Sequence, residues 1–462
     1  MNAVDDQPSP LERRLIDAVV GGDLLDLGPD GRIDPSIMRS WGQDRTIRAS
    51  IIRRIVMGRL ATDPDPHGLQ LRGVRIAGRI DLRNVTSDMW IELQECHVPD
   101  GLDLRAANLR ALDLTGSLVG HAPELGRPAV DADDMTIHLL RLDRISVTAD
   151  TTLGAVVLSG ARIGGRLDCA WARIANTHGP AIDAVNLRLD GDADFRRLAA
   201  TCAGTYGALR LRDARIAGDV DCSGAQLTNT VGAALDANGM HVDGETLFGS
   251  SFAATSGCND GTVQLINARI DKQLTCREGL VENLVGPAIH ADGLHIDGNF
   301  LLRGRFNVRS ACPSGGIRLL GAFVGGQLDC PGAQVSNTSG PAIHAEGIRV
   351  EGDVYLNQGF AATGATHYGA VRLLGADIGG HLMCDGATLT NASGPALDGN
   401  LMRIGRDVYL SGGFAATGSD EFGAIVLRGA RIGGRVFFGT GRIHNTAGAA
   451  FDGTGMHEPF PS

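Results

Sequence analysis

Apolar residues recur in pairs, at positions i and i+2, through most of the chain. One stretch shows four pairs, each five or six residues after the last: Val156/Leu158, Ala161/Ile163, Leu167/Cys169 and Ala172/Ile174. Alternation with period 2 in such short segments predicts strands of two or three residues with one buried face. Glycines such as Gly164 and Gly165 stand between the pairs, where the chain must turn.

The pattern itself repeats every 54 residues. Six copies of a GAVVLSGARIGG-like segment are separated by 53 residues once and by 54 residues four times; they begin at Gly154, Gly207, Gly261, Gly315, Gly369 and Gly423. Each copy contains a weaker half-copy, such as GPAIHAEGIRVEGDVYL from Gly340, so one coil has about 26 to 27 residues. A constant period of this length is typical of a solenoid, whose coils pack only on their neighbours.

The first 62 residues follow a helical pattern instead. Ser9, Pro10 and Glu12 fit an N-cap, a first-turn proline and a capping-box acid, and Gly21 and Gly22 follow as a stop. A second helix is predicted to begin at Asp34-Pro35. A third is predicted around Ile47, Ile51 and Ile55, which lie four residues apart. We therefore expect a helical cap over residues 1–62 and a β-solenoid over residues 63–462.

The segment LDLRAANLRALDLTGSLV carries a resemblance to a known family. Its residues Leu104, Leu109, Leu114 and Val119 are five apart, and each has an apolar or small residue two positions before it. This segment resembles the pentapeptide-repeat family, and the whole layout resembles actinobacterial proteins of that type with an N-terminal helical segment. The resemblance implies a mainly β fold, a right-handed parallel β-helix with a quadrilateral cross-section.

Five cysteines share one repeat position, and the sixth copy has Phe438 there: Cys169, Cys222, Cys276, Cys330 and Cys384. A position that accepts phenylalanine, on the same side as buried leucines, indicates core packing. Asparagines recur at the corner loop of all six copies, where their amides could stack into a ladder: Asn176, Asn229, Asn283, Asn337, Asn391 and Asn445. Both sets are predicted to be structural. Cys202, Cys258 and Cys312, which recur in the long loops, are expected to be exposed.

Candidate chemistry is sparse. His241 and His295 share a position with Arg188, Arg349 and Arg403 and are predicted to face outward. A metal site built from His290, His295 and His344 would require adjacent faces to fold toward each other. The column of Asp168, Asp221 and Asp329, which could supply acid and base, is interrupted by Thr275, Met383 and Phe437. No phosphate loop or nucleophile elbow is present. We name no catalytic residue, cofactor or metal ligand.

The predicted outer columns alternate in sign. One basic stripe contains Arg210, Arg318 and Arg372; a second contains Arg162, Arg215, Arg269 and Arg431; an acidic column contains Asp192, Glu245, Asp353 and Asp407. Tyr355 and Tyr409 are predicted to be exposed in one column, and Phe437, Phe451 and Phe460 gather near the C-terminus. The candidate interaction surface consists of Arg210, Arg318, Arg372, Tyr355, Tyr409, Phe437, Phe451 and Phe460.

Composition narrows the class of protein. The 462 residues include 65 glycines, and only 4% are aromatic, which suits tight turns and small core residues. No run approaches 18 apolar residues, and MNAVDDQPSPLERR lacks the pattern of a signal peptide, so we expect no membrane span and a cytoplasmic protein. The nine cysteines are then expected to be reduced. Residues 63–462 carry 33 basic and 44 acidic residues, so no direct binding of nucleic acid is expected.

These observations favour a non-catalytic scaffold that binds another macromolecule, through its faces or through its Phe-rich C-terminal end, where a homodimer could also form. The resemblance implies an alternative. Some pentapeptide-repeat proteins imitate duplex DNA, bind the type II topoisomerase gyrase and protect it. A second alternative is a carbohydrate-active enzyme working on one face of the β-helix.

Overall fold

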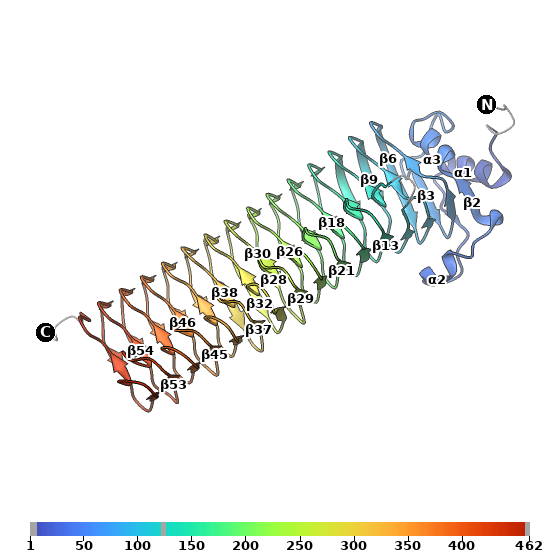
Figure 1. The fold of residues 1–462 in the computed structure, drawn as a ribbon. Coiled ribbons are helices and arrows are strands. Elements are labelled where there is room, and N and C mark those ends of the chain that lie inside the picture. Colours follow the sequence, from blue (N-terminus) through green and yellow to red (C-terminus); the bar gives the residue numbers. More distant parts are fainter. Residues whose placement is uncertain (1–6, 122–125, 458–462) are drawn as a thin grey trace. The chain divides into compact units, whose positions relative to one another are not determined.

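The structure, a computed structural model, describes residues 7–121 and 126–457. The described chain forms two compact units, one up to Gly218 and one from Asp219 onward. Each unit is a parallel β-solenoid with coils of about 27 residues (Figure 1), and small helices precede the first coils of unit 1. In the described part of the chain, no helix combines the length and apolar character needed to cross a bilayer.

Unit 1 begins with the helices α1 (Pro10–Gly21), α2 (Pro35–Met38) and α3 (Ala49–Val56). The predicted capping box is confirmed: Ser9 accepts a hydrogen bond from the Glu12 amide, and Glu12 accepts one from the Ser9 amide. The prediction that Ile47 belongs to the third helix is wrong. Ile47 is the buried centre of a strand, β2 (Thr46–Arg48), and the helix begins immediately after it.

The N-terminal segment joins the solenoid through strands. β1 (Leu25–Asp26) pairs in parallel with β3 (Leu69–Arg72), and β2 pairs with β4 (Arg75–Ala77). α1 and α3 lie against these strands and against β5 (Ile80–Asp81), in the blue part of Figure 1. The edge backbone groups of the first coil are thereby covered by strands of the same chain, as an exposed sheet edge requires.

One coil of unit 1 shows the local logic. Its strands are β15 (Arg162–Ile163), β16 (Leu167–Asp168), β17 (Arg173–Asn176) and β18 (Ile182–Asp183). In β15, β16 and β18 the inward residue is apolar and buried while the outward residue is polar, and β17 buries both Ile174 and the polar Asn176. The coil therefore has the four short strands that the paired apolar pattern predicts.

The quadrilateral cross-section is not what the structure shows, because these four strands belong to three parallel sheets. The reason lies in β12 (Thr136–Arg141), a six-residue strand of the preceding coil. β12 runs across the corner and pairs with both β15 and β16, so two adjacent faces form one sheet. The Gly164–Gly165 corner bends this sheet and does not end it.

Unit 2 has the same architecture. A typical coil consists of β48 (Leu382–Met383), β49 (Thr388–Asn391), β50 (Leu397–Asp398) and β51 (Arg403–Ile404). Each strand pairs in parallel with the strand at the same place one coil away, without register shifts in the pairings given for this unit. Every outward position therefore continues as a column along the unit.

The interior of unit 2 alternates small and large side chains. Phe248 of β28 (Thr246–Phe248) pairs with Cys276 of β32 (Leu274–Arg277), which pairs with Leu302 of β36 (Phe300–Arg303). These three side chains are at most 3% exposed. The five repeat cysteines are all buried free thiols, and the four in unit 2 alternate with the bulkier Phe248, Leu302 and Leu356 of the half-copies.

The expectation that Cys202, Cys258 and Cys312 are exposed is wrong, because all three are buried. Cys202 ends β21 (Ala199–Cys202) and pairs with Asn176, so it takes the inward corner position that the asparagines hold in other coils. In unit 2, Cys312 is 6% exposed, and Asn337 accepts a hydrogen bond from its amide and donates one to its carbonyl.

The ladder hypothesis expects the corner asparagines to stack on one another, but they do not. Ser310 of β37 (Asn307–Ser310) stands between Asn283 and Asn337 in the register. Each amide instead bonds the backbone: Asn337 Nδ2 donates to the carbonyls of Cys312 and Pro341, each at 2.7 Å, and its Oδ1 accepts from the Cys312 amide. The asparagine thus ties the corner of its own coil to the preceding one.

Candidate functional site

An outward column of unit 2 brings together several of the residues singled out in the sequence. Tyr355 of β44 (Val354–Tyr355), Met383, Tyr409 of β52 (Val408–Tyr409) and Phe437 of β56 (Val436–Phe437) pair in one register. We call these four residues the aromatic column. Parallel pairing places successive members roughly 4.8 Å apart along the sheet.

The aromatic column is held in place by its neighbours. The rings of Tyr409 and Phe437 stack with centroids 5.0 Å apart and planes 13° apart. The Tyr355 hydroxyl donates to Asp353 at 2.9 Å, and the Tyr409 hydroxyl donates to Asp407 at 3.2 Å. The hydrogen bond to Asp353, together with burial, raises the pKa of Tyr355. These contacts fix the rings as a preorganised apolar strip with a carboxylate beside each tyrosine.

A shallow groove of about 550 Å³ lies beside the Tyr355 end of the column. Its walls include Arg303, Gln327, Asp329, Tyr355, Asn357 and Met383. Asp329 occupies the outward position next to Tyr355 in the register, and Arg303 Nε donates to its carboxylate at 2.8 Å. The groove thus offers an aromatic face, amide groups and a paired carboxylate within one strip of the surface.

The other end of the aromatic column lies in the last described coil. Phe437 is 39% exposed and Phe438 is 38% exposed, whereas Leu410, the inward residue one coil earlier, is 0% exposed. Phe438 meets Phe451 of β58 (Phe451–Asp452) edge to face at 5.2 Å. Phe460 lies outside the described residues. The apolar strip is therefore continuous with partly exposed core residues.

The arginines of the predicted basic stripe all lie beside carboxylates. In unit 1, Arg210 lies 3.3 Å from Asp183. In unit 2, Arg318 lies 2.6 Å from Asp292, and Arg372 lies 3.1 Å from Glu346. These side chains are only 13–25% exposed. Their part in an interaction surface stays a prediction.

The register also places histidines among these arginines, which the repeat spacing alone did not reveal. His290 and His344 flank Arg318 in one outward column of unit 2. Burial alone would raise the pKa of Asp292, but hydrogen bonds with His290 and Arg318 lower it below its ordinary value. Asp292 therefore joins two coils as a shared acceptor.

Two of the histidines considered for a metal site have backbone partners. His290 Nδ1 lies 2.8 Å from the Asp260 carbonyl, and His344 Nδ1 lies 2.9 Å from the Ser314 carbonyl. Across residues 7–121 and 126–457, a different trio has ligand atoms within reach of one ion: His241, Asp243 and Asp271. Arg269 Nε donates to Asp271 at 2.8 Å, so that carboxylate already has a cationic partner.

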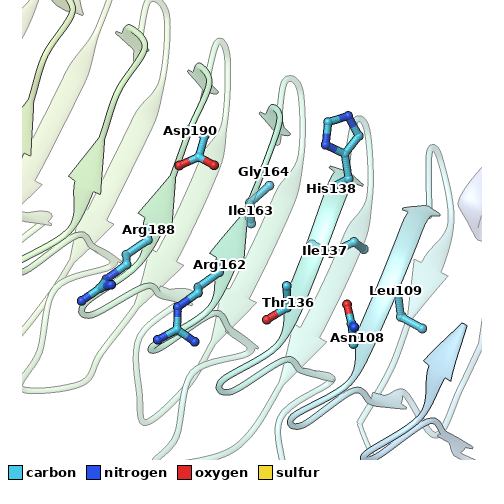
Figure 2. Close-up of a pocket in the computed structure, with 10 residues that line it drawn as sticks. All are labelled: Asn108, Leu109, Thr136, Ile137, His138, Arg162, Ile163, Gly164, Arg188 and Asp190. Carbon is cyan, nitrogen blue, oxygen red and sulfur yellow. The ribbon is translucent and has the colours of Figure 1, made fainter. Parts of the chain in front are cut away.

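A second groove lies in unit 1, over β12 and β15 and over β19 (Arg188–Leu189), and has a volume of about 520 Å³. One outward column crosses it: Asn108 of β9 (Asn108–Asp113), Thr136, Arg162 and Arg188. The column continues to Arg215 of β23 (Arg215–Ile216). Figure 2 shows the Arg162 and Arg188 side chains at one end of the groove and His138 and Asp190 at the other.

The repeat spacing places Arg162 and Arg215 in one basic stripe and Arg188 in a different repeat position, with His241 and His295. Arg162 and Arg215 belong to the main copies, while Arg188 belongs to a half-copy, so their shared column appears only once the two half-repeats are interleaved. The offset of 26 or 27 residues between Arg162, Arg188 and Arg215 was the available signal.

Comparisons with known proteins add no assignment. Neither the family models, nor the curated proteins, nor the solved structures include a match to this chain. The structure itself shows a parallel β-solenoid with three sheets and an N-terminal group of helices.

Proposed function

We propose that this protein is a non-catalytic scaffold that binds another protein through the aromatic column of unit 2. The observation that carries the proposal is the alignment of Tyr355, Met383, Tyr409 and Phe437 as four successive outward residues. Outward positions of a solenoid are ordinarily polar, and large aromatic residues are enriched at the centres of protein interfaces.

The surroundings of the column favour a basic partner surface. Asp353 and Asp407 each accept a hydrogen bond from a tyrosine of the column and keep a carboxylate at its margin. The whole chain carries 53 acidic residues against 42 basic ones. An apolar strip with an acidic margin complements a protein surface with apolar side chains framed by lysine or arginine.

We also propose that the chain is related to the pentapeptide-repeat proteins and that its coils wind in the right-handed sense. It is supported by the five-residue spacing from Leu102 to Val119 and by the four short strands of each coil. The two alternatives predict different results: the gyrase-binding mimic predicts gyrase as the captured protein, and the carbohydrate-active enzyme predicts turnover of a glycan in a separate activity assay.

The test uses a photo-reactive amino acid at position 409 of the full chain in its producing cells. We expect a protein to be cross-linked at position 409 and to be captured also by the wild-type chain. This capture should be lost with Tyr355→Ser/Tyr409→Ser. The control is Val231→Ser/Val285→Ser, which removes apolar residues that are 50% and 51% exposed elsewhere in unit 2. Equal capture by both double variants, or cross-linking only to a second copy of the chain, would contradict the proposal.

A further inference from the structure

We propose that the groove of unit 1 lined by Arg162 and Arg188, together with Arg215 next to it in the same column, is a binding site for a phosphate-bearing anion with two or more charges. The three arginines occupy the same outward position in successive coils. Their guanidinium groups therefore stem from backbone positions roughly 4.8 Å apart. All three residues are exposed. The site lies in unit 1 and does not depend on the function proposed for the aromatic column.

These arginines differ from several others in the same unit. Arg105 pairs with Asp103 at 2.8 Å, and Arg166 and Arg196 both pair with Asp194. Among the described residues, no carboxylate lies within ion-pair distance of Arg162, Arg188 or Arg215. The fold thus stacks three cations without supplying their counter-charge. A bound anion would relieve the repulsion between them.

The groove has a polarity that would orient a ligand. Thr136 and Asn108 extend the arginine column with uncharged hydrogen-bonding groups. At the other end, His138 and Asp190 flank Gly164 (Figure 2); a side-chain carbon on that glycine would lie 3.4 Å from His138 Nδ1 and 3.9 Å from Asp190 Oδ2. The Asp190 carboxylate repels anions, so negative charge is directed to the arginine end.

Phosphate fits this spacing better than carboxylate does. A carboxylate brings one negative charge and two oxygens, whereas a terminal phosphate brings up to two charges and three free oxygens for neighbouring guanidinium groups. Linked phosphates would spread two or more charges along the column. The volume of about 520 Å³ is within the range of small-molecule sites, although the groove is open on its outer side.

Isothermal titration calorimetry of the full chain with sodium triphosphate tests the proposal. We expect saturable binding that weakens at least tenfold in Arg162→Gln/Arg188→Gln and weakens further with added salt. Arg173→Gln removes an exposed arginine from the same coil but outside the groove, and it should change the affinity less than twofold. Circular dichroism checks that each variant keeps its β structure.

Two further titrations separate the ligand classes. Citrate carries three carboxylates, so binding as tight as that of triphosphate would overturn the assignment to phosphate. If a single-stranded oligonucleotide binds more tightly than triphosphate, with the same dependence on Arg162 and Arg188, the ligand is a nucleic acid and not a small anion. Absence of triphosphate binding at millimolar concentration, or equal binding by the double variant, would overturn the site itself.

Discussion

Phe248 and Cys276 occupy the same inward position of neighbouring coils, with the large ring directly beside the small thiol. Leu302 follows Cys276 on the other side. Cys276→Leu would place three large side chains in a row, so we expect it to destabilise unit 2 by about 1–3 kcal/mol through overpacking. Cys276→Ala should be the milder change. Thermal unfolding followed by circular dichroism compares the two; a Leu variant as stable as wild type would refute the alternation argument.

The buried thiols should be inert in the native protein. Burial raises the pKa of Cys384 to about 12, so almost no reactive thiolate exists at pH 8. We expect iodoacetamide to label Cys384 only after denaturation, with the mass shift located by peptide mapping. Rapid labelling of Cys384 in the folded chain would show that the interior opens locally.

The ion pair between Glu12 and Arg48 should make the N-terminal helices sensitive to acid. Burial alone would raise the pKa of Glu12, but Arg48 and the Ser9 amide lower it from 4.5 to about 2. Glu12 is 1% exposed, and its carboxylate lies 2.6 Å from the Arg48 guanidinium. Since the unfolded chain binds the proton more readily, this stabilisation is present above pH 4.5 and is lost as the pH falls toward 2.

The corresponding variant is Glu12→Gln, which removes the charge and keeps the shape. The shift of the Glu12 pKa corresponds to about 3 kcal/mol near neutral pH. The free energy of unfolding of the variant should therefore be lower by an amount of this order at pH 7. It should also change less with pH between pH 5 and pH 2 than that of the wild type. The control Asp17→Asn lies on the same helix. An unchanged acid transition in Glu12→Gln would contradict this account.

Asn337→Ala should weaken the join between two coils of unit 2. The amide makes two bonds to the backbone of Cys312 and one to the Pro341 carbonyl, all without exposure to solvent. Their loss leaves buried backbone groups unpaired, at a cost of about 2–4 kcal/mol. Hydrogen exchange of the Cys312 amide should accelerate. Thr338→Ala, at the exposed neighbouring position, should leave that exchange rate unchanged.

The repeat was sufficient to predict the solenoid, because period-2 pairs separated by glycines leave few other ways to bury an apolar face. It could not predict the number of sheets. That number depends on whether strands such as β12 continue pairing across the Gly164–Gly165 corner, which is a property of neighbouring coils and not of one coil's sequence.

Outward residues were predictable one at a time, but their neighbours were not. Tyr355 and Tyr409 were placed in one column from the repeat, yet Phe437 joins them only through the pairing of β52 with β56. For the same reason, the repeat alone did not predict that Arg162, Arg188 and Arg215 share one column. It also did not predict the ionic partners of Arg318. Side-chain pairing across coils depends on interleaving two half-repeats that have diverged in sequence.

The alternation of small and large buried side chains in successive coils limits how such a chain can change its length. Removing a single turn would set two thiols, or two bulky groups, against each other, leaving either a void or a clash. Removing a pair of turns restores the original neighbours everywhere. Lengthening of this protein by internal duplication, or shortening by deletion, should therefore be tolerated in steps of 54 residues, the period of the sequence repeat.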